Sequence, residues 1–361
     1  RRSSDLGYGV SGYVRGDGLL SYRIDFENDA DATAPAQRVV VSDQLADTVD
    51  LATFELTQIG FGDQIITVPA GSQHFQTTVP FEANGKSVEV QIEAGLDAAS
   101  GRVFAVFQTI DPAIDLPPDV MTGFLPPEDG TGRGMGFVSY VIRPKSGLTT
   151  GTEIRNVALI QFDFGETIAT NQIDPHDPGQ GTDAAKECLN TIDAGTPESN
   201  VVELPRVSVT TEFTVNWTGQ DDEGGSGIGT YDVYVSDDGD GWEKWQDRTP
   251  ETSAAFVGEP GHTYRFYSIA RDNVAWEEAS PTPDTFDTLT TVMQVPWQNP
   301  VNQYDVYGQD GVWPLDVLLI VNYINAHPGE SSVPPAPQVP PPSYNVDGDD
   351  GITAQDVLLV I

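Results

Sequence analysis

The sequence predicts a mainly β protein in which two β-sandwich domains precede a small α-helical unit that binds ions. Three observations support this fold class. Apolar and polar residues alternate along many short segments, 36 glycines and 27 prolines supply turns, and a loop–helix pattern occurs twice near the C-terminus. A chain of 361 residues is long enough for two or three domains, each with its own core.

The N-terminal half carries the clearest strand signal. Four apolar residues alternate with polar ones between Leu20 and Phe26, which is typical of a strand with one buried face. Asn84-Gly85, placed between two apolar runs, indicates a tight β-hairpin. Similar strand patterns continue to Phe164. We therefore predict one large sandwich over residues 1–175.

A polar stretch follows, and the sequence predicts a linker over residues 176–205 because Asp-Pro, glycine and Thr-Pro turn signals cluster there. A second sandwich is expected over residues 206–292, with strands near Trp217, at Tyr231–Val235 and at Tyr264–Ala270. Trp217 should lie in its core, because a sandwich usually packs one tryptophan centrally.

The third predicted domain, residues 293–361, contains one pattern twice. Residues 305–316 and 345–356 share a loop register, and each loop is followed by an apolar run, Val317–Val321 and then Val357–Ile361. Clusters of Asp, Asn and Gly often mark ordinary turns. Repetition of the whole register favours an ion-binding device instead.

The second loop offers the better ligand set. Calcium takes six to eight oxygens, and a twelve-residue loop supplies them from side chains at positions 1, 3, 5 and 12 and a backbone carbonyl at position 7. The residues at these positions are Asn345, Asp347, Asp349, Gly351 and Asp356. Position 6, where glycine is expected, is Asp350, and aspartate tolerates the left-handed turn at modest cost.

The first loop is weaker. Its candidate ligands are Asp305, Gln309, Gly311 and Asp316, while position 3 is Tyr307. Two carboxylates and one amide oxygen predict weak binding, or binding through water.

Through these two loop–helix motifs, residues 296–361 resemble a type I dockerin domain. The resemblance implies two calcium-binding loop–helix repeats packed antiparallel, with calcium held by the residues named above. Cellulosomal dockerins recognise cohesin largely through a Ser-Thr pair at positions 10 and 11. Here those positions are Pro314-Leu315 and Ala354-Gln355, so cohesin recognition does not carry over.

The first segment resembles a conserved-repeat family of bacterial secreted proteins, a domain of unknown function. Ser21–Asn28, Ala34–Gln37, Val41–Leu45 and Gly136–Lys145 carry the resemblance, which implies an immunoglobulin-like sandwich outside the cell. The second segment is similar to a fibronectin type III or related Ig-like domain, through its early tryptophan and the pattern Tyr264–Asp272.

The charge balance restricts the partners. Lys plus Arg number 17 and Asp plus Glu number 55, giving a net charge of −38. Such a surface repels nucleic acid and anionic lipid and gathers cations, and it suits a salty medium. One cysteine, Cys188, excludes an intramolecular disulfide framework. No apolar run is long enough for a membrane span, and without a signal peptide we expect a processed or trimmed chain.

No catalytic motif stands out. Gly224–Ile228 lacks the final glycine of a nucleophile elbow, and the four histidines are not at zinc spacing. We predict a non-enzymatic, secreted structural or adhesive protein, a subunit of an extracellular filament or surface layer whose partner is another copy or a cell-surface receptor. Two alternatives remain: a binding module for a protein or polysaccharide, and the C-terminal appendage of a larger secreted enzyme.

Overall fold

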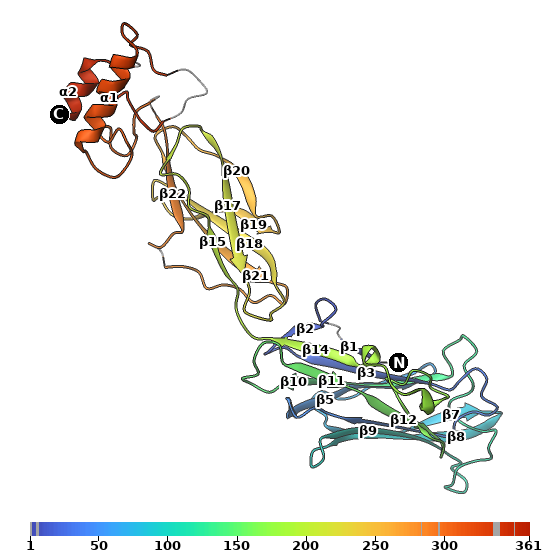
Figure 1. Cartoon of the computed structure of the whole chain (residues 1–361). Coiled ribbons are helices and arrows are strands. Elements are labelled where there is room, and N and C mark those ends of the chain that lie inside the picture. Colours follow the sequence, from blue (N-terminus) through green and yellow to red (C-terminus); the bar gives the residue numbers. More distant parts are fainter. Residues whose placement is uncertain (1, 5–6, 283, 295–296, 335–339, 350) are drawn as a thin grey trace. The chain divides into compact units, whose positions relative to one another are not determined.

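The computed structural model describes residues 2–4, 7–282, 284–294, 297–334, 340–349 and 351–361. The described chain is mainly β, with only two α-helices, both near the C-terminus (Figure 1). It divides into two compact units: Arg1–Gly195 with Asp222–Ser226, and Thr196–Asp221 with Gly227–Ile361. The predicted class, mainly β, is confirmed.

The first unit is built from three sheets. The five-stranded sheet has the order β1 (Arg2–Ser4), β3 (Leu20–Glu27), β10 (Met135–Pro144), β5 (Val49–Phe61) and β6 (Gln64–Thr67). The six-stranded sheet has the order β13 (Thr167–Ala169), β12 (Ala158–Phe162), β4 (Arg38–Gln44), β9 (Arg102–Ile110), β8 (Lys86–Asp97) and β7 (His74–Ala83). The smallest sheet joins β11 (Glu153–Asn156), β14 (Cys188–Asp193) and β2 (Tyr13–Arg15).

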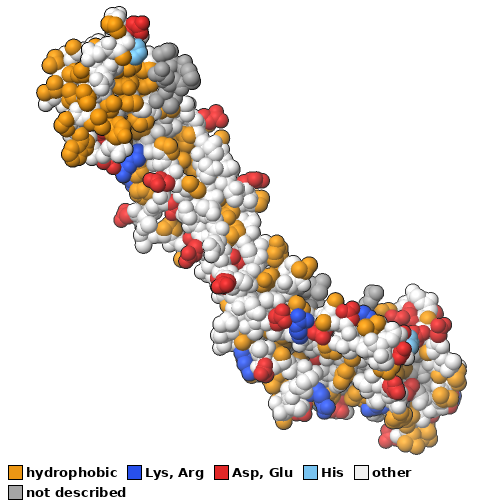
Figure 2. Space-filling model, viewed as in Figure 1, with side chains coloured by type: hydrophobic (Ala, Val, Ile, Leu, Met, Phe, Trp, Pro, Cys, Tyr) orange, Lys and Arg blue, Asp and Glu red, His pale blue; other side chains and the backbone are white. Residues whose placement is uncertain are grey.

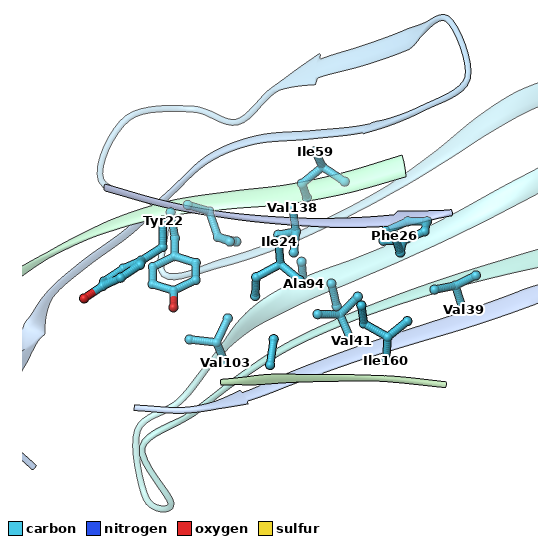
Figure 3. Packing of buried hydrophobic residues seen from close by; sticks show 14 of the residues in the cluster. Tyr22, Ile24, Phe26, Val39, Val41, Ile59, Ala94, Val103, Val138 and Ile160 are labelled. Carbon is cyan, nitrogen blue, oxygen red and sulfur yellow. The ribbon is translucent and has the colours of Figure 1, made fainter. Parts of the chain in front are cut away.

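The core of the first unit lies between the two larger sheets. Along β3 the burial alternates as predicted, with Tyr22, Ile24 and Phe26 facing inward. Figure 3 shows these side chains close to residues of the opposite sheet, such as Val41 and Ile160. The strands form because each alternating pattern buries its apolar face against the other sheet.

The predicted hairpin is present. β7 and β8 pair antiparallel down to Ala83 and Lys86, and Asn84 and Gly85 between them have φ of 50° and 70°. Ala83 and Lys86 flank the two-residue turn and form a hydrogen-bonded pair. Backbone direction alternates along a strand, so Pro80, three residues before Ala83, directs its backbone groups away from β8. Proline fits such an outward position on an edge strand, since it has no N–H to donate.

The predicted linker over residues 176–205 is wrong. It contains two 3-10 turns, η1 (Pro178–Gln180) and η2 (Ala184–Lys186), and then β14, which pairs with β11 and with β2. It also contains β15 (Glu198–Val201), a strand of the second unit. The first unit therefore extends to Gly195, and the polar turn residues flank short strands whose partners are far away in sequence.

The second unit contains a smaller sandwich. Its three-stranded sheet has the order β15, β17 (Glu212–Gln220) and β20 (Ser253–Val257). Its five-stranded sheet has the order β16 (Val207–Ser208), β22 (Thr288–Val292), β21 (Thr263–Asp272), β18 (Ile228–Asp237) and β19 (Glu243–Thr249). Trp217 is buried in its core, as predicted, and its indole N–H donates to the carbonyl of Glu251 at 2.7 Å.

The C-terminal segment holds the helices α1 (Pro314–Ala326) and α2 (Ala354–Val360). They pack with their preceding loops around a separate small core of Val306, Ile320, Val346, Ile352 and Val360. We call residues 297–361 the loop–helix unit, excluding 335–339 and 350. No helix in the described part of the chain is both long and apolar enough to cross a membrane.

Candidate metal centre in the C-terminal loops

The two loops of the loop–helix unit have the same backbone geometry at their start. In the first, the Gly308 N–H donates to Asp305 Oδ1 at 2.8 Å; in the second, the Gly348 N–H donates to Asn345 Oδ1 at 2.9 Å. The two glycines have φ of 79° and 78°, which glycine adopts without a Cβ penalty. The repeat seen in the sequence is therefore a structural repeat.

The last ligand position of each loop is a buried aspartate at the third residue of the following helix. Asp316 accepts from the backbone N–H groups of Tyr307 and Trp313, both at 2.7 Å. Asp356 accepts from Val346 at 2.6 Å and Thr353 at 2.7 Å. Each carboxylate thus caps its helix and closes its loop, which explains why a charged group is fully buried there.

The second loop brings its acidic residues together. Burial raises the pKa of Asp347, and the negative charges of Asp356 and Asp349 raise it further. Backbone N–H groups of Asp349 and Gly351 donate to Asp347 and Asp349, respectively, which holds these side chains along the loop. Nearby carboxylates that disfavour one another's charge are the electrostatic setting that a divalent cation relieves.

In the first loop, the carboxylate at position 1 is occupied by backbone donors of the loop. Asp305 accepts from the backbone N–H groups of Gly308, Gln309 and Gly311, while the Gln309 side chain is exposed. Tyr307, at the third position, brings no carboxylate. The structure thus places Asp305 and Asp316 in the loop interior, but gives that loop fewer acidic oxygens than the second.

The residues of the second loop fit calcium. Asn345, Asp347, Asp349 and Asp356 supply hard oxygen donors, and the Gly351 carbonyl is the predicted backbone ligand. The Oδ1 atoms of Asp347 and Asp349 each accept one backbone N–H and keep a further lone pair, whereas Asp356 Oδ1 accepts from both Val346 and Asp347. Asp350, predicted to form the sharp turn, lies outside the described residues. The ligand assignment stays a prediction, with the first loop the weaker site.

Apolar side chains are exposed around the helices. Figure 2 shows hydrophobic side chains gathered over the loop–helix unit. Trp313 is 60 % exposed, Leu318 is 51 % exposed and Ile361 is 84 % exposed. The other exposed large apolar residues of the two loop–helix repeats are Tyr304, Tyr307, Val312, Leu315, Leu358 and Leu359. An exposed apolar group of this extent typically marks a binding surface.

One titratable cluster was not predicted from the sequence. His262 Nδ1 lies 2.9 Å from Asp237 Oδ1 and 3.2 Å from Asp238 Oδ2, and its Nε2 lies 3.7 Å from Glu259 Oε2. The hydrogen bond to Asp237 and the surrounding carboxylates raise the pKa of His262. The sequence carries no signal for it, because these residues lie in separate turns that only the β18–β21 pairing brings together.

A buried polar trio lies inside the first unit. The Tyr140 hydroxyl donates to Asp43 Oδ2 at 2.6 Å, and Asn156 Nδ2 donates to the same oxygen at 3.1 Å. These hydrogen bonds join β11 to the two larger sheets. All three side chains are buried, so a substrate has no access to them.

Comparison with known proteins gives one family match. A family model described as "Domain of unknown function (DUF7619)" matches residues 72–175, from just before β7 to just after β13. Of the four stretches on which the expected likeness to a domain of unknown function rests, the match includes Gly136–Lys145. A search of curated proteins finds no match.

Several solved structures are similar at low identity. The fibronectin(III)-like modules of Clostridium thermocellum CbhA are 12% identical, with a TM-score of 0.25, covering 78% of this chain and 87% of that chain. The C-terminal domain of the Streptococcus agalactiae AgI/II polypeptide BspA is 12% identical, with a TM-score of 0.31 and coverage of 81% and 100%. The pilus 2b backbone protein of group B streptococcus is 13% identical, with a TM-score of 0.28 and coverage of 81% and 96%. These TM-scores are low, and the likenesses carry no argument about function.

Proposed function

We propose that this chain is a non-enzymatic structural or adhesive component of the cell exterior, in which a calcium-stabilised, dockerin-like unit attaches the β-sandwiches to a protein partner. The observation that carries the proposal is the structural repeat of the two loops, each closed by a buried aspartate and each leading into a helix. The two sandwich cores, packed from apolar side chains of facing sheets, support a mechanical role for the rest.

Calcium has a folding role in this proposal. The loop–helix unit has a core cluster of only five buried aliphatic residues, and small units rarely gain enough stability from such a core alone. The acidic residues of the second loop disfavour one another's charge, so binding a divalent cation adds stability that the core lacks. The partner-binding surface then depends on the ion, because it is formed by the helices that the loops hold.

The exposed apolar side chains of α1 and α2 provide the docking surface. Leu318 on α1 and Leu358 on α2 are 51 % and 66 % exposed, and the burial of such side chains typically contributes about 1.5–3 kcal/mol each. A net charge of −38 makes a partner with a basic rim around an apolar centre the best match.

A calorimetric scan with and without chelator tests the calcium role. Full-length protein in excess calcium should show a transition for the loop–helix unit that moves to lower temperature after EDTA treatment, while the sandwich transitions stay in place. Magnesium at equal concentration serves as the control for ionic strength. Identical scans in calcium and in EDTA would contradict the proposal.

Capture of partners from cell-envelope fractions tests the docking role. The wild-type chain should retain a protein in calcium and release it in EDTA. Leu318→Asp should abolish retention, whereas Ile65→Asp, at an exposed apolar position of β6, should not. Equal retention by both variants, or retention that ignores calcium, would count against docking through this surface.

A further inference from the structure

A histidine and two aspartates come together at one end of the second sandwich. β18 and β21 lie side by side (Figure 1), and Asp237, the last residue of β18, is opposite Tyr264. His262 Nδ1 lies 2.9 Å from Asp237 Oδ1 and 3.2 Å from Asp238 Oδ2. One ligand atom from each of these three side chains lies within 4.8 Å of the other two. One imidazole nitrogen and two carboxylates therefore surround one small volume.

The turn after β18 fixes the second aspartate. The Asp238 N–H donates to the Thr263 carbonyl at 2.9 Å, and Asp238 Oδ1 accepts from the Thr263 N–H at 2.8 Å. These two bonds hold Asp238 against the start of β21, and its other oxygen, Oδ2, is the one near His262. Asp238 has a φ of 49°, a left-handed conformation that aspartate adopts at modest cost. One oxygen of this carboxylate is therefore used by the fold, and the other faces the ring.

His262 is positioned by its own backbone. The Val292 N–H donates to the His262 carbonyl at 2.9 Å, and the His262 N–H donates to the Glu259 carbonyl at 3.3 Å. The imidazole ring lies at 18° to the Tyr264 ring, with the two centroids 6.3 Å apart. The place of the ring thus follows from β21 and β22 and not from the aspartates alone.

The second ring nitrogen has a carboxylate of its own. Glu259 Oε2 lies 3.7 Å from His262 Nε2, and the Glu259 N–H donates to the Tyr264 hydroxyl at 2.8 Å, which holds the Glu259 loop beside the ring. Nδ1 and Nε2 point in different directions, so Glu259 acts on the ring and not on the volume between the aspartates. Histidines that bind a metal usually donate their other ring N–H to such a group, which keeps the lone pair on the ligating nitrogen. Glu259 can thus hold the Nε2 proton while an ion occupies Nδ1.

The donor atoms and their spacing select the kind of ion. Zinc binds imidazole nitrogen together with carboxylate oxygen, usually with four ligands in a tetrahedron. Bonds of about 2.0–2.1 Å separate neighbouring ligand atoms in such a tetrahedron by about 3.3 Å. The separations around Nδ1, 2.9 and 3.2 Å, are close to this value. Calcium takes six to eight oxygens, and a set of one nitrogen and two carboxylates suits it poorly.

An ion can reach these side chains from solvent. The side chains of His262, Asp237 and Asp238 are 38 %, 48 % and 50 % exposed. Water therefore has room to supply a fourth ligand. The two aspartate charges balance the two charges of a divalent cation, and a neutral imidazole adds none.

We propose that His262, Asp237 and Asp238 bind a zinc ion, with Glu259 as the positioning residue that accepts a hydrogen bond from Nε2. The ion joins the turn after β18 to the residue before β21. The site differs from the C-terminal loops in its donor atoms and belongs to a sandwich with its own core, so it does not rest on the proposed role of calcium.

Zinc titration of the full-length chain by isothermal titration calorimetry tests this proposal. Excess calcium is present throughout, so that the C-terminal loops do not take up zinc. The wild type should show a zinc-binding event that His262→Gln weakens at least about a hundredfold, because a direct ligand is lost. Asp238→Asn keeps the shape of its side chain and should weaken binding at least about tenfold. Circular dichroism establishes that the variants fold.

Two matched changes serve as controls. His176 Nε2 in the first unit lies 3.1 Å from Asp29 Oδ2, but His176 belongs to no described group of three ligands. His176→Gln should therefore leave zinc binding unchanged. Asp347→Asn in the second C-terminal loop should also leave it unchanged, which separates this site from the loops.

Nuclear magnetic resonance of the histidine rings tests the role of Glu259. Zinc should shift the Nδ1 signal of His262, and the Nε2 proton should then exchange slowly with water. Glu259→Ala should weaken zinc binding about tenfold and make that proton exchange faster, which a merely structural role would not do.

Three results would overturn the proposal. One is a wild type that binds no zinc. Another is an equal loss of zinc binding in His262→Gln and His176→Gln, which would indicate general attraction of cations to the acidic surface. The third is a loss in Asp347→Asn as large as that in His262→Gln, which would assign the zinc to the C-terminal loops.

Discussion

The second sandwich and the loop–helix unit bury different kinds of side chain. In the sandwich, Trp217 packs edge-on against Trp245 with their ring centroids 6.0 Å apart, inside a core of aromatic and aliphatic side chains. In the loop–helix unit, the buried set includes Asp316, Asn345 and Asp356, each accepting backbone N–H groups. The sandwich has the larger apolar core, and in the loop–helix unit the proposed calcium would act on buried polar contacts.

This difference predicts that the stability of the sandwich varies little with ions, whereas the stability of the loop–helix unit depends on them. Apolar burial varies little with ionic conditions, whereas buried carboxylates near other acids change their energy when a cation arrives. A unit with few aliphatic core residues and several buried polar groups should therefore order and disorder with its ligand. The following changes test that contrast, from the largest expected effect to the smallest.

Trp217→Ala should cost the sandwich about 3–5 kcal/mol, because it leaves a large cavity and an orphaned Glu251 carbonyl. Chemical denaturation followed by the fluorescence of the remaining tryptophans measures the loss. Calcium titration of the variant should match the wild type, since the loops have their own core. A parallel loss of calcium binding would show that the two regions are not independent.

Asp356→Ala should destabilise the loop–helix unit by about 3 kcal/mol, since it leaves the N–H groups of Val346 and Thr353 without their acceptor. Asp316→Ala should have a similar effect through the first loop. Amide hydrogen exchange in α1 and α2 measures both. The matched control, Asp349→Ala at an exposed position, should leave exchange in calcium-free buffer nearly unchanged; strong deprotection there would weaken the contrast.

Asp347→Asn should weaken calcium binding about tenfold, because it removes one carboxylate from the second loop while keeping its shape. Gln309→Ala, which changes a candidate ligand of the first loop, should leave the tighter binding event intact. Isothermal titration calorimetry distinguishes the two. Weakening of the tight event by Gln309→Ala alone would reverse the assignment of the stronger site.

His262→Gln should remove a small pH dependence of sandwich stability. Its hydrogen bond to Asp237 and the nearby carboxylates raise the pKa of His262, so the folded state holds the proton more tightly than the unfolded chain. That stabilisation is complete below the ordinary histidine pKa of about 6.5 and is lost as the pH rises through the raised value. Urea midpoints at about pH 6 and pH 9 should differ in the wild type only. An unchanged difference in the variant would assign it to other groups.

Local signals were read correctly from the sequence. The alternation of β3 and the Asn84-Gly85 turn depend on neighbouring residues, so each pattern specifies its own element. The register of the two C-terminal loops is local in the same way. The ions themselves remain a prediction, because ligand spacing specifies a loop and not its occupancy.

Features that depend on distant pairing were missed. The sequence predicts a linker where β14 lies, because this strand is short and lies among turn residues. Its partners, β2 and β11, are far away in the chain.

Pro80 limits how far strand pairing could extend the first unit. β7 is an edge strand of the six-stranded sheet, next to β8. Pro80 lies at an outward position of β7 and interrupts the row of backbone donors along this edge. Sheet growth from copy to copy would need two compatible edges on every molecule. A strand added along β7 would meet no backbone donor at Pro80, so pairing with a second copy at this edge would be interrupted there.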